Sequence, residues 1–303
     1  MNIAEKFGTV LPTTVVGSYP VVSQRGLSSL FDPLRSAVHT AIGDQVAAGI
    51  DIISDGQVRG DMVQIFSRRL PGIRGLEVIG KVLPAEETIT AADTRQALRT
   101  ATRVKGIVTG PTTLAHALHL STRVYRNKEE LALDLAAALA REVRGLVESG
   151  VCIIQIDEPI FSTGIADLGN GREAIRLTRE GVGVPVCLHA CGGLSEIIDD
   201  LLAMPVDILD IECAKSPANL DLFSKTDLKG KGIGFGCVDS ADPAIEDPER
   251  IADRIRKGIE AFGAETMLLD PDCGLRMQSR ESAFGKLQNL VLAARTVRAE
   301  IGK

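Results

Sequence analysis

Tryptophan is absent from this 303-residue chain, and aromatic residues of all kinds make up only 3% of it. The commonest platform for stacking a large flat ring is therefore missing. Long basic runs are missing as well, and 34 Lys and Arg against 40 Asp and Glu give a formal net charge of -6. A phosphate backbone requires a broad positive field, so this balance argues against nucleic acid as a partner.

Long apolar runs are also lacking. No stretch approaches the roughly 18 apolar residues that cross a bilayer, and the start, MNIAEKFGTVLPTT, lacks the basic and apolar regions of a signal peptide. We expect a cytoplasmic protein that does not act at a membrane. Six cysteines are too few for a disulfide scaffold, and in a reducing cytosol they stay thiols, which leaves them available as metal ligands.

Short runs rich in β-branched residues alternate with longer segments of helical period. Among the helical segments are residues 30–49, 129–150, 172–181, 194–205, 248–263 and 281–301. Eight strand–helix alternations imply parallel strands with crossovers, and near-continuous apolar strands favour a closed (β/α)8 TIM barrel over an open sheet. The eight predicted strands are residues 13–18, 50–55, 104–110, 152–157, 185–190, 206–212, 232–239 and 266–272.

One interval breaks the alternation. Residues from about 57 to 103 contain RRLPGIRGLEVIGKVLPAEE, which is typical of a hairpin or arm inserted after the second strand. We expect residues 1–303 to form a single catalytic barrel domain with this arm beside the site.

In a barrel of this kind the chemistry lies at the carboxyl ends of the strands. The predicted strands deliver polar residues there almost throughout: Ser18; Asp55 and Gln57; Thr109; Asp157 and Glu158; His189 and Cys191; Glu212 and Cys213; Asp239; and Asp272 and Cys273.

The stretch VCLHACGG places His189 two residues before Cys191. Taken alone, this pair is equally typical of two core residues beside a turn. The balance changes because Glu212 and Cys273 are predicted at the same end of the barrel, and N, S and O ligands from several strands suit a catalytic Zn²⁺. The remaining cysteines are interpreted as packing or outward-facing residues: Cys152, Cys187, Cys213 and Cys237.

Two further stretches indicate substrate contacts. Asp157 ends the fourth strand just before Glu158 and Pro159, where we favour a contact with substrate over a helix cap. Ser18, in GSYP, is compatible both with a plain tight turn and with a backbone and hydroxyl site for a carboxylate.

An ordered set of motifs over nearly the whole chain resembles the catalytic half of cobalamin-independent methionine synthase. The resemblance implies a TIM barrel whose zinc is held by His189, Cys191, Glu212 and Cys273. It also implies that Ser18 and Asp157 bind the amino-acid part of homocysteine. The motifs are LPTTVVGSYP, SDGQVRGDMV, IVTGPTT, IIQIDEP, LHACGG, DIE and PDCGL.

The sequence departs from the folate-using members of that family. It resembles the short, core-only form of the family rather than the longer folate-using enzyme, which has a duplicate barrel. Where the folate-using members carry a proton-donating histidine after the seventh strand, this sequence reads CVDSADP. Asp239 stands in that stretch and, with Asp157, is a candidate catalytic residue. We therefore expect methylcobalamin or a methylated corrinoid protein as the methyl donor. Asp55 or Gln57 replaces the glutamate with which the family holds the substrate ammonium.

Three alternatives remain open at this stage. The zinc motif is shared with barrel methyltransferases that methylate coenzyme M. A metal-free enzyme resembling uroporphyrinogen decarboxylase would leave His189, Cys191 and Cys273 without a common role. A barrel that acts only as a binding or scaffold module would leave most of the polar strand ends without a use.

Overall fold

The computed structural model describes residues 1–22 and 32–302. Its centre is a curled sheet of parallel strands in the order β3-β5-β6-β7-β8-β9, in which every strand after β3 pairs with the preceding strand of the sheet. These strands match the last six predicted runs. Their bounds are β3 Lys105–Thr109, β5 Ile153–Asp157, β6 Val186–Ala190, β7 Ile208–Glu212, β8 Gly232–Val238 and β9 Met267–Pro271.

The first two predicted runs close the ring without forming regular strands. Thr13 makes a single parallel bridge to Leu269 of β9, and Ile53 makes one to Val104 beside β3. Ile52 N–H donates to Thr13 O at 3.0 Å, which joins the two runs to each other. The predicted barrel is therefore confirmed, whereas the prediction of full strands at 13–18 and 50–55 was wrong.

Side chains explain why those two runs leave the ladder. Lys105 Nζ donates to Val15 O at 2.8 Å, and Gln155 Nε2 donates to Val16 O at 2.6 Å. In the second run, Ser54 N–H donates to Gln45 Oε1 at 2.8 Å, and Gln45 Nε2 donates to Ser54 O at 3.2 Å. Backbone groups satisfied by side chains are not available to a neighbouring strand.

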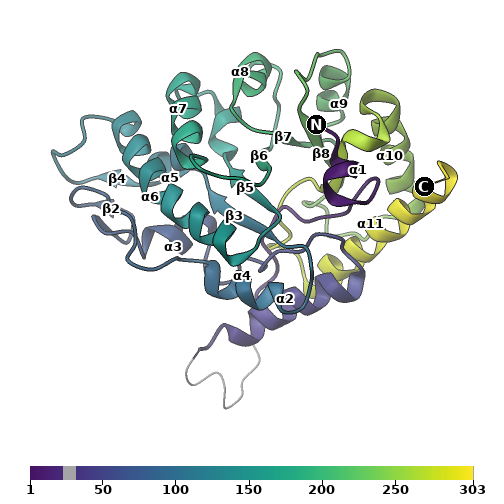
Figure 1. Cartoon of the computed structure of the whole chain (residues 1–303), viewed down its shortest axis with the longest axis horizontal. Coiled ribbons are helices and arrows are strands. Elements are labelled where there is room, and N and C mark those ends of the chain that lie inside the picture. Colours follow the sequence, from purple (N-terminus) through teal and green to yellow (C-terminus); the bar gives the residue numbers. More distant parts are fainter. Residues whose placement is uncertain (23–31, 303) are drawn as a thin grey trace.

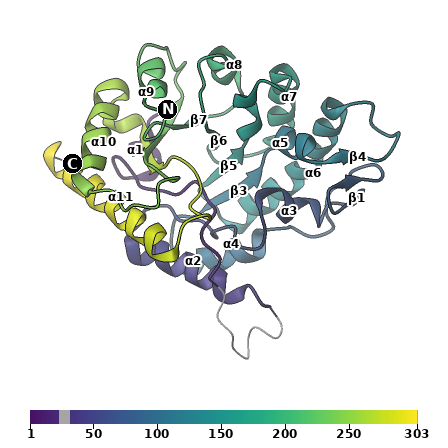
Figure 2. The same ribbon diagram turned by 180° about the vertical axis from the view of Figure 1, so that it is seen from behind.

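Helices cover the outside of the sheet, and α6 to α10 follow one another around its rim (Figures 1 and 2). The longest covering helix, α6, ends at Ser149 and is capped by Gly150, whose φ of +103° favours glycine. The predicted helical segments are confirmed, although residues 30 and 31 of the first lie outside the described part. The covering helices are α2 Arg35–Ala48, α5 Pro111–Ala117, α6 Lys128–Ser149, α7 Leu168–Thr178, α8 Ile198–Ala203, α9 Pro217–Phe223, α10 Pro248–Phe262 and α11 Arg280–Glu300, and the short 3₁₀ helices are η2 Pro159–Thr163 and η3 Ala264–Thr266.

The two ends of the barrel differ. Helix α1 (Ile3–Phe7) packs Ile3 and Phe7 against residues at the amino ends of the strands, such as Ile153 and Ile208. That end is thereby plugged by apolar side chains. The polar residues predicted at the carboxyl ends lie at the opposite end.

The interval 57–103 contains helices α3 (Met62–Ser67) and α4 (Ala91–Leu98) and a small hairpin of β1 (Ile73–Arg74) and β2 (Glu77–Val78). Strand β2 also pairs in parallel with β4 (His119–Leu120). The segment thus forms a small second sheet beside the barrel.

The last helix ties the segment just before the first run to the second run. Arg298 donates to Val10 O at 2.9 Å and to Leu11 O at 2.8 Å, and its guanidinium pairs with Asp51 at 2.6 Å. In the part of the chain that the structure describes, no helix is long and apolar enough to span a membrane.

Candidate metal centre and substrate pocket

Three of the predicted metal ligands meet at the carboxyl end of the barrel. His189 and Cys191 come from the end of β6, and Cys273 follows β9. One ligand atom from each lies within 4.8 Å of the others. An N, S, S set at this spacing matches the ligands that Zn²⁺ prefers.

The ligand atoms have few competing partners. His189 is 2% exposed, and neither of its ring nitrogens has a hydrogen-bond partner within the described residues. The two thiols interact, which lowers the pKa of Cys191 and, together with burial, raises the pKa of Cys273. Buried polar atoms without partners are costly, so this cluster is suited to binding an ion.

Glu212 lies beside the cluster without joining it. It ends β7 and is 8% exposed. Its carboxylate accepts hydrogen bonds from Ser216 Oγ at 2.6 Å and from Gly192 N–H at 3.2 Å. The structure therefore places the fourth predicted ligand, at the end of β7, in contact with Gly192, the residue that follows Cys191.

A pocket of about 320 Å³ opens over the cluster. Its volume suits a small substrate such as an amino acid. Its lining contains Ser18, Gln57 and Asp157 of the predicted substrate residues. The lining residues are Val16, Ser18, Gln57, Gly60, Asp61, Met62, Asp157, Pro159, His189, Cys191, Cys273, Gly274, Arg276 and Met277.

Asp157 is held in place from within the barrel. Its Oδ1 accepts a hydrogen bond from Gln155 Nε2 at 2.7 Å, and Gln155 Oε1 accepts one from Lys105 Nζ at 2.6 Å. Burial raises the pKa of Asp157 to about 6, although the neighbouring His189 acts in the opposite direction. A carboxyl group so confined is suited to binding a cationic group such as an ammonium.

The sequence left open whether Asp55 or Gln57 contacts the substrate. In the structure, of the two only Gln57 lines the pocket over the cluster. Asp55 accepts a hydrogen bond from Gln57 N–H at 3.0 Å and lines a second pocket of about 170 Å³ rather than the one over the cluster. Gln57 lines both pockets, is 7% exposed and adopts φ +45°. Its Nε2 has no hydrogen-bond partner within the described residues. Of the two, Gln57 has the free donor at the cluster.

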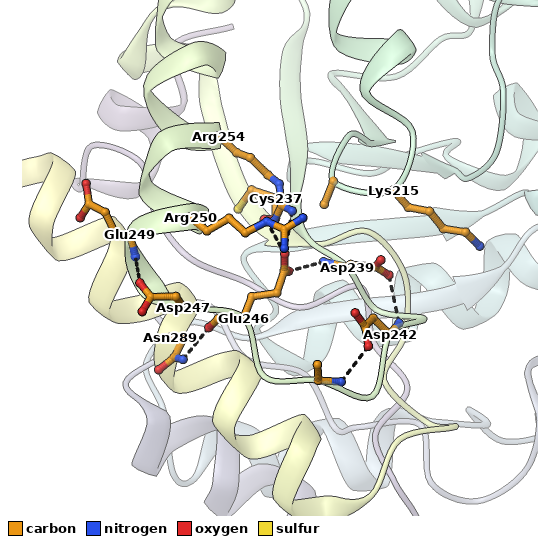
Figure 3. Close-up of polar contacts among 12 residues, drawn as sticks. Lys215, Cys237, Asp239, Asp242, Glu246, Asp247, Glu249, Arg250, Arg254 and Asn289 are labelled. Carbon is orange, nitrogen blue, oxygen red and sulfur yellow. Dashed lines mark hydrogen bonds and ion pairs between the residues drawn. The ribbon is translucent and has the colours of Figure 1, made fainter.

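Asp239 does not line the pocket over the cluster. Its Oδ1 accepts hydrogen bonds from Ala241 N–H at 2.8 Å and Asp242 N–H at 3.2 Å, and its own N–H donates to Glu246 at 2.9 Å (Figure 3). Glu246 also pairs with Arg254 at 2.6 Å. The carboxylate thus stabilises its own turn, a role that spacing in the sequence could not reveal.

Arg276 is a pocket residue that sequence reasoning missed. Its Nη1 donates to Gln57 O at 3.2 Å, and its guanidinium borders the pocket. The available signal was its position three residues after Cys273, in the loop DPDCGLR. Its positive charge is of the kind that suits an anionic part of a substrate.

The fold and the site together define a barrel enzyme whose active pocket lies at the carboxyl ends of parallel strands, over a cluster of metal-ligand type. Comparison with known sequences identifies the family to which this enzyme belongs. The family described as the catalytic domain of cobalamin-independent synthase matches residues 11–296. The chain therefore belongs to the cobalamin-independent methionine synthase family and is a methionine synthase-like methyltransferase, which confirms the predicted resemblance.

Relatives of similar length support this assignment. The methionine synthase of Methanothermobacter marburgensis is 40% identical, covering 93% of this chain and 98% of the relative. That of Methanocaldococcus jannaschii is 38% identical, covering 94% and 99%. A B12-independent methionine synthase from Shewanella sp. W3-18-1, solved in complex with selenomethionine, superimposes with a TM-score of 0.87 at 26% identity and covers 97% of this chain and 99% of the other.

Proposed function

We propose that this chain transfers a methyl group from a methylcorrinoid to the thiol of homocysteine, forming methionine, with Zn²⁺ held by His189, Cys191 and Cys273. The observation that carries the proposal is the meeting of these three ligands under a pocket that Ser18 and Asp157 line. Glu212 is the fourth, exchangeable ligand. Residues 1–303 act as one catalytic domain, in which the interval after Asp55 borders the pocket.

The donor set fits zinc better than a hard cation. One imidazole and two thiols are borderline-soft ligands, whereas Mg²⁺ and Ca²⁺ prefer oxygen. The ligands come from separate strands of a rigid frame, as is typical of catalytic rather than structural sites. When bound, zinc would make the substrate thiol a thiolate at neutral pH, which is the nucleophilic form.

The protein's own residues orient the substrate. Asp157 binds the ammonium of homocysteine, while Arg276 and the Ser18 hydroxyl surround its carboxylate. The sequence offered Asp55 or Gln57 as a contact of the ammonium, but the Gln57 Nε2 donor has no partner within the described residues, so we assign the Gln57 amide to the carboxylate instead. Fixing both ends of the amino acid directs the thiol toward the cluster, and such positioning accounts for a large part of an enzyme's rate enhancement. Coenzyme M lacks the ammonium, so the confined Asp157 favours an amino-acid acceptor.

We infer the methyl donor from whether the protein can supply a proton to the leaving group. A methyl group on a folate nitrogen leaves well only when that nitrogen is protonated, whereas a methyl group on cobalt leaves as Co(I) without a proton. The loop after β8 has no histidine, and its Asp239 carboxylate is engaged in its own turn. These features support a methylcorrinoid, free or presented by a corrinoid protein.

Metal analysis coupled to turnover tests the proposal. We expect about one zinc per wild-type chain and almost none in Cys273→Ala, while Cys152→Ala, at the amino end of β5, keeps its zinc. Homocysteine should be methylated faster from methylcobalamin than from methyltetrahydrofolate, and an excess of mercaptoethanesulfonate should not compete. A zinc-free wild type would refute the metal site, and preferential use of the folate would refute the donor.

A further inference from the structure

His189 has a carboxylate neighbour on the side away from the substrate pocket. Asp210 is its register partner on the adjacent strand β7, so both side chains project into the barrel from neighbouring positions. His189 Nδ1 lies 3.4 Å from Asp210 Oδ2. Asp210 is 0% exposed, so its carboxyl group meets the imidazole out of contact with water.

A second carboxyl group, Asp270 of β9, lies in the same interior and is also 0% exposed. Strand β8 runs between β7 and β9, and Gly234 occupies the register position opposite Asp210. A Cβ at Gly234 would lie 2.7 Å from the Asp210 Cβ, so only glycine leaves Asp210 its space. The carboxyl oxygens of Asp210 and Asp270 have no hydrogen-bond partner among the residues described.

We propose that Asp210 is the positioning residue of the metal centre: it accepts the Nδ1–H of His189 and thereby turns Nε2 toward the ion. This inference rests on the zinc site proposed above. A metal-ligating histidine whose other nitrogen donates to a carboxylate is fixed in tautomer and ring orientation, and losing that acceptor typically costs about 10–100-fold in metal affinity. Asp270 has the same residue type and burial but does not contact the imidazole.

The pair Asp210→Asn and Asp270→Asn provides a matched test. Both variants keep shape and remove one carboxyl group from the same buried interior. Zinc affinity, measured by competition with a chelator, should fall by about 10–100-fold in Asp210→Asn and by less than about threefold in Asp270→Asn, because the carboxyl group recorded beside the imidazole is that of Asp210. Equal losses in the two variants, or no loss in Asp210→Asn, would overturn the inference.

Nitrogen NMR of the wild type gives a second readout that does not depend on either carboxyl variant. The chain has only four histidines, so the signals of His189 can be assigned by comparison with His189→Gln. In the zinc-loaded protein, Nδ1 should carry a proton and Nε2 should bind the metal. Metal on Nδ1 would overturn the inference even if Asp210→Asn failed to fold. A wild type that binds no zinc would instead refute the proposed function, so the two failures are distinguishable.

Discussion

Gly274 approaches Ser18 so closely that a Cβ at residue 274 would lie 2.0 Å from the Ser18 Oγ. Leu275 N–H also donates to Ser18 O at 2.8 Å, which holds the loop after the last strand against the first loop of the barrel. The Ser18 hydroxyl therefore has room only because residue 274, in the loop that carries Cys273, is a glycine.

Gly274→Ala should displace the Ser18 hydroxyl from the pocket. Because a hydroxyl rotates readily, we expect little change in stability but a KM for homocysteine raised about 10-fold or more, as for loss of a hydrogen bond to a charged group. Zinc content should not change. Gly183→Ala is the control, since a Cβ there meets nothing within 4 Å. An unchanged KM in Gly274→Ala would remove Ser18 from the substrate site.

Gln57→Met should weaken substrate binding selectively. The change removes the unpartnered Nε2 donor at the pocket while keeping an unbranched side chain of similar length. Steady-state kinetics should show KM for homocysteine raised by about 10-fold with kcat little altered, which indicates loss of uniform binding. Gln96→Met is the control, because Gln96 Nε2 is likewise buried without a partner but lies on α4, away from this pocket.

Asp55→Asn should change how stability depends on pH. Burial raises the pKa of Asp55 from its ordinary value of 3.8 to about 7, so the folded chain retains a proton that the unfolded chain releases. Stability from this group is present at low pH and is lost as pH rises toward 7. Between pH 5 and 8 the variant should gain roughly 2–3 kcal/mol over the wild type in free energy of unfolding.

Denaturant titrations at several pH values measure that difference. It should level off above about pH 7.5, because ionisation is then complete in both the folded and the unfolded chain. A difference that does not vary with pH would show that Asp55 ionises normally in the folded protein.

Lys105→Met should destabilise the barrel strongly. Lys105 is 1% exposed, binds Val15 O and Gln155 Oε1, and its charge lowers the pKa values of Asp157, Asp210 and Asp270. Removing a buried charge that balances others typically costs about 3–5 kcal/mol in free energy of unfolding.

Lys231→Met is the matched control for that loss. Lys231 also donates to two backbone carbonyls, Met204 O and Val206 O, each at 2.8 Å, but it is half-buried and binds no carboxyl group of the barrel interior. Its replacement should cost about 1–2 kcal/mol. Equal losses in the two variants would show that Lys105 contributes only its hydrogen bonds.

The barrel could be predicted from the sequence because a barrel of strands and helices imposes a regular spacing on the apolar residues. Six strands and the covering helices follow from the spacing of apolar residues, and the meeting of His189, Cys191 and Cys273 follows from their shared position at strand ends. The first two strands were predicted too long because Lys105, Gln155 and Gln45 are distant in sequence. Their side-chain contacts with Val15, Val16 and Ser54 leave no trace in the periodicity of those runs.

The direction in which a side chain points after the end of a strand could not be predicted from the sequence either. Asp55 and Gln57 are two residues apart, but Gly56 with φ +81° and Gln57 with φ +45° turn the backbone between them. Asp239 stabilises a turn whose shape depends on Glu246 and Arg254. Such orientations depend on local backbone angles and distant partners, which spacing does not encode.

The contacts of Arg298 indicate when the barrel closes during synthesis of the chain. Its guanidinium holds the carbonyls of Val10 and Leu11 and the carboxylate of Asp51, so one side chain of the last helix secures both irregular segments of the barrel. During synthesis the amino-terminal part of a chain emerges first. We therefore expect the segments that lead to Ser18 and Gln57 to be held in their final positions only after the last helix has been synthesised.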